Sequence, residues 1–143
     1  MEKSDKSKKN ICIAAIKRHT IPPFEFKHTK IYDCKDQTLI PEIKDAIHLE
    51  GEEELICSTF VSPTIWTLLT TRRIFSLEGV GLKKHGLVGI KKWDFGDFKG
   101  YSKQPYTKGF LHFENGDVIT FFTETREASM VMIYGIRTMS KLT

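Results

Sequence analysis

The stretch "GFLHFENGDVITFF", Gly109–Phe122, indicates a β-hairpin. Its two halves are apolar and rich in residues that favour strands. Asn115–Gly116 stands between them, and an Asn-Gly pair is typical of a two-residue type I′ turn. With these residues as the turn, Phe113 would pair with Val118. The stretch therefore predicts that the chain contains an antiparallel sheet.

This register places apolar side chains on both faces of the hairpin. One face would carry Phe110, His112, Ile119 and Phe121. The other face would carry Leu111, Phe113, Val118, Thr120 and Phe122. A hairpin with one solvated face should alternate apolar and polar residues instead. We therefore expect a cover on each side, supplied by residues 1–49 or by a second copy of the chain.

Further strands are predicted ahead of the hairpin, for a total of about six. The clearest of these apolar, β-prone runs are residues 54–61, 64–69 and 72–77. Thr70–Arg72 would form the turn between the last two runs. Residues 91–103, "KKWDFGDFKGYSK", alternate until Gly96, where a bulge or bend is expected. The glycine-rich residues 78–89 are expected to form a flexible connection.

A long helix is predicted after the hairpin, at about residues 124–142. Thr123 or Thr125 could cap its start, and apolar residues recur at helical spacing. This stripe consists of Ala128, Val131, Met132, Gly135, Ile136 and Met139. One amphipathic helix that closes an antiparallel sheet is typical of a small barrel or sandwich.

The leader, residues 1–49, is less regular. Residues 1–10 are polar and lysine-rich and are expected to be a solvated, frayed terminus. Residues 10–16 fit either a strand or one turn of helix. A short extended piece is expected after Pro22–Pro23, and residues 41–49 begin with a proline that suits the first turn of a helix.

Length, charge and cysteine content limit the classes to which the protein can belong. The 143 residues fit one domain, and 22 basic against 18 acidic residues give a net charge of +4. Cys12, Cys34 and Cys57 are an odd count without a Cys-x-x-Cys pair, so neither a disulfide framework nor a zinc site is expected. Reduced cysteines favour a cytoplasmic protein. No apolar run is long enough for a transmembrane segment, and no signal peptide is recognised.

From residue 50 onward the chain resembles the bacterial PH-like (pleckstrin homology-like) domains. The resemblance rests on "GEEELICSTFVSP", "WTLLTTRRIFSL" and "KKWDFGDFKGY", followed by the hairpin and the long helix. It implies a mainly β fold, a half-open barrel of two packed antiparallel sheets capped by a C-terminal α-helix. It also implies a non-catalytic module in residues 50–143, preceded by an extension in residues 1–49. Related eukaryotic domains bind phosphoinositides through a basic first hairpin loop, but residues 58–64 contain no lysine or arginine.

Two groups of basic residues are candidates for ligand binding. Arg72 and Arg73 could grip a phosphate or carboxylate, or they could simply mark the turn between two strands. A second group flanks the glycine-rich connection and could face an anionic lipid, or could belong to a solvated loop. It comprises Lys83, Lys84, Lys91 and Lys92.

The sequence favours a non-catalytic binding or scaffolding module. The expected partner is a protein or peptide, or a second copy of the chain in a homodimer, rather than lipid. No nucleic acid, cofactor, metal or catalytic residue is expected, because neither the histidines nor Asp94 and Asp97 show a catalytic or ligating spacing. The alternatives are a peripheral membrane module and a small enzyme. An enzyme site would lie beside the leader and use residues such as His19, His28 and Tyr32.

Overall fold

The computed structural model describes residues 3–33, 37–101 and 103–143. Predictions that fall on Met1, Glu2, Cys34 and Ser102 lie outside the described residues. The helices are α1 (Asp5–Arg18), α2 (Pro41–Ala46), the short 3-10 helix η1 (Arg126–Ala128) and α3 (Ser129–Leu142). The strands are β1 (Thr29–Ile31), β2 (Leu55–Ser62), β3 (Ile65–Thr70), β4 (Arg73–Glu78), β5 (Gly81–Gly86), β6 (Ile90–Asp94), β7 (Tyr106–Phe113) and β8 (Val118–Glu124).

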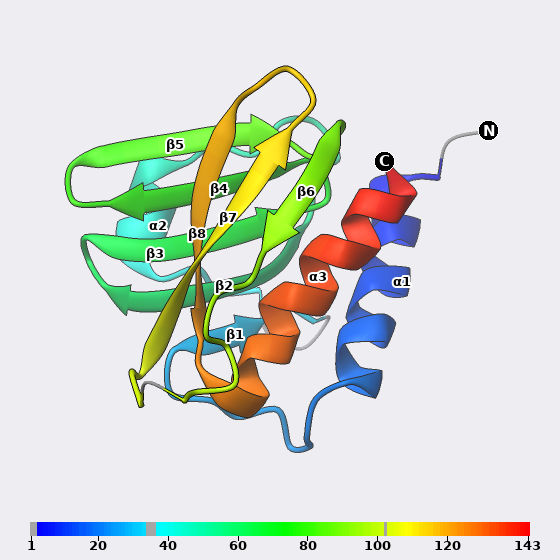
Figure 1. Cartoon of the computed structure of the whole chain (residues 1–143). Coiled ribbons are helices and arrows are strands. Elements are labelled where there is room, and N and C mark those ends of the chain that lie inside the picture. The colour runs from blue at the N-terminus through cyan, green and yellow to red at the C-terminus, as the bar shows by residue number, and fades with distance from the viewer. Residues whose placement is uncertain (1–2, 34–36, 102) are drawn as a thin grey trace.

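The fold is mainly antiparallel β with a C-terminal helix, which confirms the predicted fold class. The strands form one sheet in the order β1-β2-β3-β4-β5 and a second in the order β6-β7-β8 (Figure 1). β8 packs across β3, β4 and β5, and the amide of Phe122 donates to Thr67 Oγ1 at 2.8 Å. The two sheets meet there without closing into a continuous barrel. No helix in the described part of the chain is both long and apolar enough to cross a membrane.

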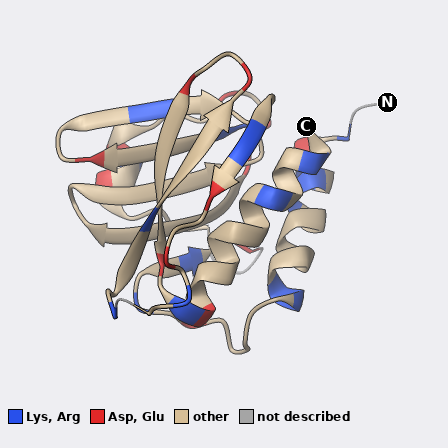
Figure 2. Cartoon of the chain, in the orientation of Figure 1, with Lys and Arg blue, Asp and Glu red and all other residues tan. Residues whose placement is uncertain are grey.

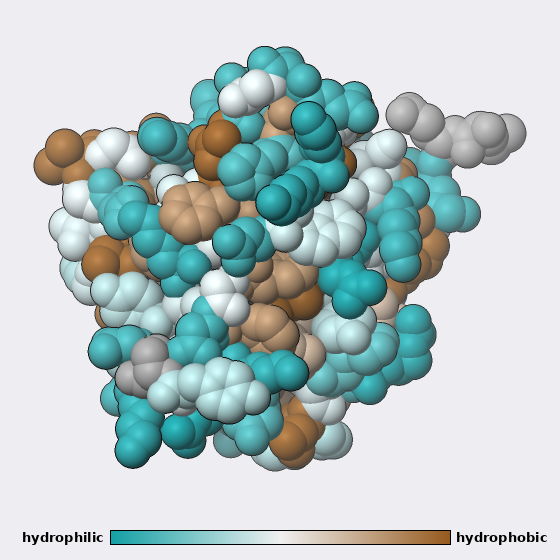
Figure 3. All heavy atoms as spheres, in the orientation of Figure 1, coloured by the Kyte–Doolittle hydropathy of each residue, from teal (hydrophilic) through white to brown (hydrophobic). Residues whose placement is uncertain are grey.

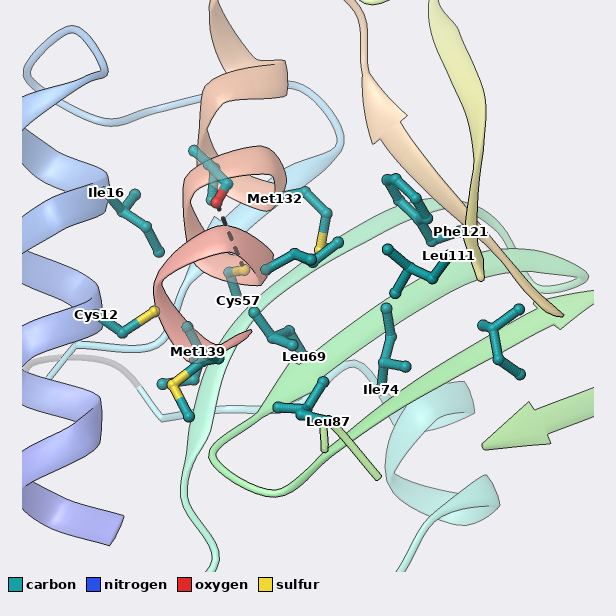
Figure 4. Packing of buried hydrophobic residues seen from close by; sticks show 14 of the residues in the cluster. Cys12, Ile16, Cys57, Leu69, Ile74, Leu87, Leu111, Phe121, Met132 and Met139 are labelled. Carbon is teal, nitrogen blue, oxygen red and sulfur yellow. Dashed lines mark hydrogen bonds between the residues drawn. The ribbon is translucent and has the colours of Figure 1, made fainter. Parts of the chain in front are cut away.

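The main core lies between the two sheets and the helix pair α1–α3. Cys12 and Ile16 of α1, Cys57 of β2 and Met139 of α3 are all buried in it (Figure 4). Gly135 sets the approach of α3, because a Cβ there would lie 2.8 Å from Leu69 Cδ2. The leader therefore contributes directly to the core, through α1.

A second, smaller core lies on the opposite face of the five-stranded sheet. Trp66, Leu68 and Phe75 project from the sheet, and Tyr32 and Ile43 of the leader cover them. In Figure 1, α2 lies behind this sheet, on the side away from α3. The leader thus covers an outer sheet face, but that face belongs to β2–β4 and not to the hairpin. Whether residues 50–143 form a separate domain stays a prediction.

The predicted hairpin register is wrong by one residue. His112 pairs with Val118 and Leu111 with Ile119. The Asn115 side chain accepts a hydrogen bond from the amide of Asp117, and Phe113 bonds to Asp117 O, so the loop is longer than two residues. Because a one-residue slip moves side chains to the other face, the observed register changes which residues of the two strands share a face. One face carries the buried Leu111, Phe113, Ile119 and Phe121. The other carries Phe122, which is also buried, with the partly exposed Phe110, His112 and Thr120 and the exposed Val118.

The expectation of a frayed N-terminus is also wrong. Ser4 accepts a hydrogen bond from the amide of Ser7 and caps α1, and Asp5 lies in the first turn. The helix buries only a narrow face, with Cys12 and Ile16 at its centre, and carries basic residues around it. Because few residues of α1 are buried, residues 1–10 are mostly polar, and their composition resembles that of a solvated tail.

Three element boundaries also differ from prediction. Residues 78–89 contain a regular strand, β5, which pairs with β4 along its whole length. The helix predicted at 41–49 ends at Ala46, and α3 starts at Ser129 after η1. The break predicted at Gly96 is present, since φ is +64° and a Cβ would lie 2.6 Å from Lys108 O. The described residues form eight strands where about six were expected, because β1 and β5 fall in regions predicted as leader and loop.

Candidate functional site

Arg73 forms a buried ion pair with Glu53. Its Nη2 lies 2.6 Å from Glu53 Oε1 and its Nε 3.1 Å from Oε2, and the Glu53 side chain is 0% exposed. Burial favours the neutral acid, but hydrogen bonds from Arg73 and Thr70 outweigh it and lower the pKa of Glu53. Nη2 also donates to the His48 carbonyl oxygen at 2.8 Å. Arg73 therefore fastens the leader to the sheet.

Arg72 points the other way, toward α1. Its Nη2 lies 2.8 Å from Asp5 Oδ2, and Thr71 Oγ1 donates to Asp5 Oδ1 at 2.6 Å. The hydrogen bond from Arg72 is the largest contribution that lowers the pKa of Asp5. The turn between β3 and β4 is confirmed, and both arginines are engaged with carboxylates of the chain itself.

The four candidate lysines do not share one surface. Lys83 and Lys84 are consecutive residues of β5 and project to opposite faces, whereas Lys91 and Lys92 lie on β6 in the second sheet, where the pairing with β7 is irregular between Ile90 and Lys92. Lys84 lines a hollow of about 390 Å³ with Arg73 and Phe75, whereas Lys83 lines another beside Thr120. Figure 2 shows the two lysine pairs as blue segments on separate strands, with acidic residues on neighbouring turns.

The polar residues considered for catalysis are also dispersed. The ring of His19 stacks on Tyr134 with centroids 3.6 Å apart, and the hydroxyl of Tyr32 lies 2.8 Å from Ser58 Oγ in the second core. Asp94 and Asp97 accept hydrogen bonds from nearby backbone amides in the turns after β6. No group of three His, Cys, Asp or Glu side chains suited to a metal ion occurs among the described residues.

Two cysteines are buried thiols. Burial raises the pKa of Cys12 to about 12 and raises that of Cys57 well above its ordinary value. Cys12 Sγ donates to Gly135 O at 3.5 Å, and Cys57 also faces α3 (Figure 4). A protonated, inaccessible thiol is a poor nucleophile, so these residues act in packing.

β1 is an edge strand of the five-stranded sheet, in a region where the sequence predicted only a short extended piece. His28 O accepts from the amide of Phe60 at 2.7 Å, and the amide of Tyr32 donates to Ile56 O at 2.9 Å. Because the hydrogen-bonding direction alternates along a strand, the amides and carbonyls of Thr29 and Ile31 point away from β2. Within the described chain, no hydrogen bond is made to these outward groups.

A groove of about 570 Å³ runs beside this edge, and we call it the β1 groove. Aromatic and aliphatic side chains alternate in it with charged ones. Its lining comprises Lys17, Pro23, Phe24, Glu25, Phe26, Lys27, His28, Thr29, Lys30, Ile31, Asp33, Ile40, Ser58 and Phe60. Lys17 is paired with Asp33 at 3.2 Å and Lys30 donates to Thr38 O, whereas Lys27 makes no side-chain bond to any described residue. The groove therefore combines apolar walls, free backbone groups and an excess of cations.

The sequence offered a partial signal for this groove. The extended piece predicted after Pro22–Pro23 forms one wall of it, through Phe24 and Phe26. The three-residue strand that follows was too short for a period-two pattern to be recognised.

Comparison with protein-family models, with curated protein sequences and with solved structures gives no significant match for this chain.

Proposed function

We propose that this chain is a non-catalytic binding module of PH-like type that holds an extended segment of a partner protein against β1. One observation carries the proposal: the outward amides and carbonyls of Thr29 and Ile31 lie beside the β1 groove. An added strand would satisfy these groups, and the groove would take its alternate side chains. Because β1 has three residues, the added strand makes few backbone bonds, and we expect micromolar rather than nanomolar affinity.

The composition of the groove determines the chemistry of the segment. Phe26 and Phe60 provide apolar contact area, so we expect apolar residues in the segment. Lys27 at the start of β1 lacks a partner among the described side chains, whereas Asp33 at the far end is already paired. We therefore expect acidic residues where the segment approaches Lys27.

The order of strands and the closing helix support the PH-like assignment, and the buried cysteines suit a cytoplasmic protein. The dispersal of Lys83, Lys84, Lys91 and Lys92 favours a peptide over a lipid surface. On the face shown in Figure 3, apolar side chains form small separate groups among polar ones. A large apolar dimer interface on that face is therefore disfavoured.

The proposal is tested by selecting binders for the full chain from a randomised peptide library and mapping them by NMR. We expect apolar and acidic sequences that shift the backbone amides of Thr29 and Ile31 on saturation. Selected peptides that leave β1 unperturbed and shift another surface would overturn the proposal, as would a failure to obtain saturable binders.

A further inference from the structure

A second hollow adjoins the β1 groove at its basic end. It measures about 320 Å³ and is lined by Lys27, His28, Lys103, Gln104, Pro105, Glu124, Thr125 and Arg126. Lys27 and His28 line both hollows, so the two lie next to each other. We call the second one the anion hollow. In Figure 2, blue segments gather on the loops at the foot of the molecule, beside the start of α3.

Three cations of the anion hollow have no side-chain partner among the described residues. Lys27, Lys103 and Arg126 form no side-chain hydrogen bond or ion pair with any residue that the structure describes. His28 Nδ1 lies 3.2 Å from Phe60 O, and a carbonyl requires Nδ1 to be the donor. His28 is thus oriented by the Phe60 carbonyl, and the permanent positive charge of the hollow comes from Lys27, Lys103 and Arg126.

The single carboxylate in the hollow is already occupied. Glu124 Oε1 accepts from the amide of His28 at 2.7 Å and from Thr29 Oγ1 at 2.8 Å, and Oε2 accepts from the amide of Lys27 at 3.2 Å. Glu124 thereby fixes the start of β1, and these hydrogen bonds come from neutral donors and not from the cations of the lining. Three cations and one carboxylate give the lining a formal charge of +2.

The backbone holds two of these cations in unfavourable conformations. Lys103 and Arg126 have φ of +62° and +76°, in the left-handed region that side chains rarely adopt. The amide of Arg126 donates to Phe98 O at 2.7 Å, and a Cβ at Gly100 would lie 3.0 Å from Arg126 Nε. The surrounding turns therefore fix the position of Arg126 at some cost in conformational energy.

We infer that the anion hollow binds a phosphate monoester carried by the segment that occupies the β1 groove. A dianion matches the charge of the lining, whereas one carboxylate would leave a cation unneutralised. Arg126 supplies the planar donors that favour phosphate oxygens. This inference rests on the proposed function, because the shared Lys27 and His28 join the groove to the hollow.

The test uses the isotopically labelled full chain, phenyl phosphate as the simplest monoester probe, and a groove-binding peptide with and without phosphoserine. We expect phenyl phosphate to shift the amides around Lys27 and Arg126, and phosphoserine to strengthen peptide binding about tenfold. Arg126→Gln and Lys103→Gln should each weaken phenyl phosphate binding about three- to fivefold. Lys91→Gln is the matched control, since it removes the same charge outside the hollow, and it should change little.

The outcomes separate the two proposals. If Ile31→Pro weakens peptide binding about tenfold relative to Ile31→Ala and leaves phenyl phosphate binding intact, both proposals are supported. If unphosphorylated peptides bind at β1 but phenyl phosphate produces no saturable shift, only the anion hollow is refuted. The anion hollow would also be refuted if Lys91→Gln weakened phenyl phosphate binding as much as Arg126→Gln does. If vesicles of phosphatidylcholine and phosphatidylserine bind through Arg126 while phosphoserine peptides do not, the phosphate belongs to a lipid and the inference is wrong.

Discussion

Arg73 and Glu53 form a two-point ion pair in which the carboxylate is completely buried, with Nη2 2.6 Å from Oε1. The pair joins the first residue of β4 to the segment that precedes β2. Because Arg73 also bonds to the His48 carbonyl, it connects the sheet to the end of the leader. The arginine that the sequence left open as an anion-binding candidate is therefore committed to a structural carboxylate.

Arg73→Met should destabilise the chain by about 3 kcal/mol, because it leaves the Glu53 carboxylate buried without its cation. The double variant Arg73→Met/Glu53→Gln should be more stable than Arg73→Met alone, because the unpaired buried charge is removed. Urea denaturation of both variants measures the free energy of unfolding. Arg72→Met is the matched control and should cost less, since that guanidinium is more exposed. Equal losses for the two arginine variants would contradict a special role for the buried pair.

The same pair predicts a loss of stability in acid. The pKa of Glu53 in the folded chain lies below its ordinary value of 4.5. Its contribution is therefore complete above that value and is lost as the pH falls through the lower, folded pKa. Comparison of unfolding free energies at neutral pH and below pH 4.5 should show a smaller acid dependence in Glu53→Gln than in the unmodified chain. Parallel pH profiles would argue against this assignment.

Gly135→Ala should destabilise the fold by about 1–3 kcal/mol, although alanine favours helices. The added methyl group would meet Leu69 Cδ2 at 2.8 Å and Cys57 Sγ at 3.3 Å. Ser140→Ala, at a partly exposed position of α3, serves as the control and should be neutral or stabilising. Thermal unfolding followed by circular dichroism measures both. A Gly135→Ala variant as stable as the control would mean that α3 has room to move away from the sheet.

Cys12 and Cys57 should resist alkylation in the folded chain. A thiol with a pKa of about 12 contains little thiolate at pH 8, and both side chains are inaccessible. We expect labelling at least about a hundredfold slower than in denaturant. Mass spectrometry of the labelled peptides measures the extent of alkylation at each cysteine separately. Rapid labelling of either thiol without unfolding would show that α1 or α3 opens locally.

Removal of residues 1–49 should prevent stable folding. A chain that begins at Glu50 lacks Ile16 from the main core and Tyr32 and Ile43 from the second one. Burial of such side chains is worth roughly 1.5–3 kcal/mol each. Light scattering after size-exclusion chromatography should show aggregation. A soluble, monomeric, cooperatively folded truncated chain would instead support residues 50–143 as an independent domain.

The sequence predicted the architecture better than it predicted the candidate site. Local patterns located β2–β4, the hairpin and α3, because each has a strong apolar period. The register of the hairpin differs because the loop is longer than the Asn115–Gly116 pair, and the spacing of the apolar residues does not reveal that length. α1 was missed because its buried face is narrow. The β1 groove was missed because its edge is three residues long and its walls come from segments that only the folded chain brings together.

The most direct measurement compares the affinity of a selected peptide for Ile31→Pro and Ile31→Ala, by isothermal titration calorimetry. Both variants lose the isoleucine packing, but only proline removes the outward amide, which is not part of the pairing with β2. The account predicts that Ile31→Pro binds about tenfold more weakly than Ile31→Ala, with both chains folded. Equal affinities would contradict strand addition at β1.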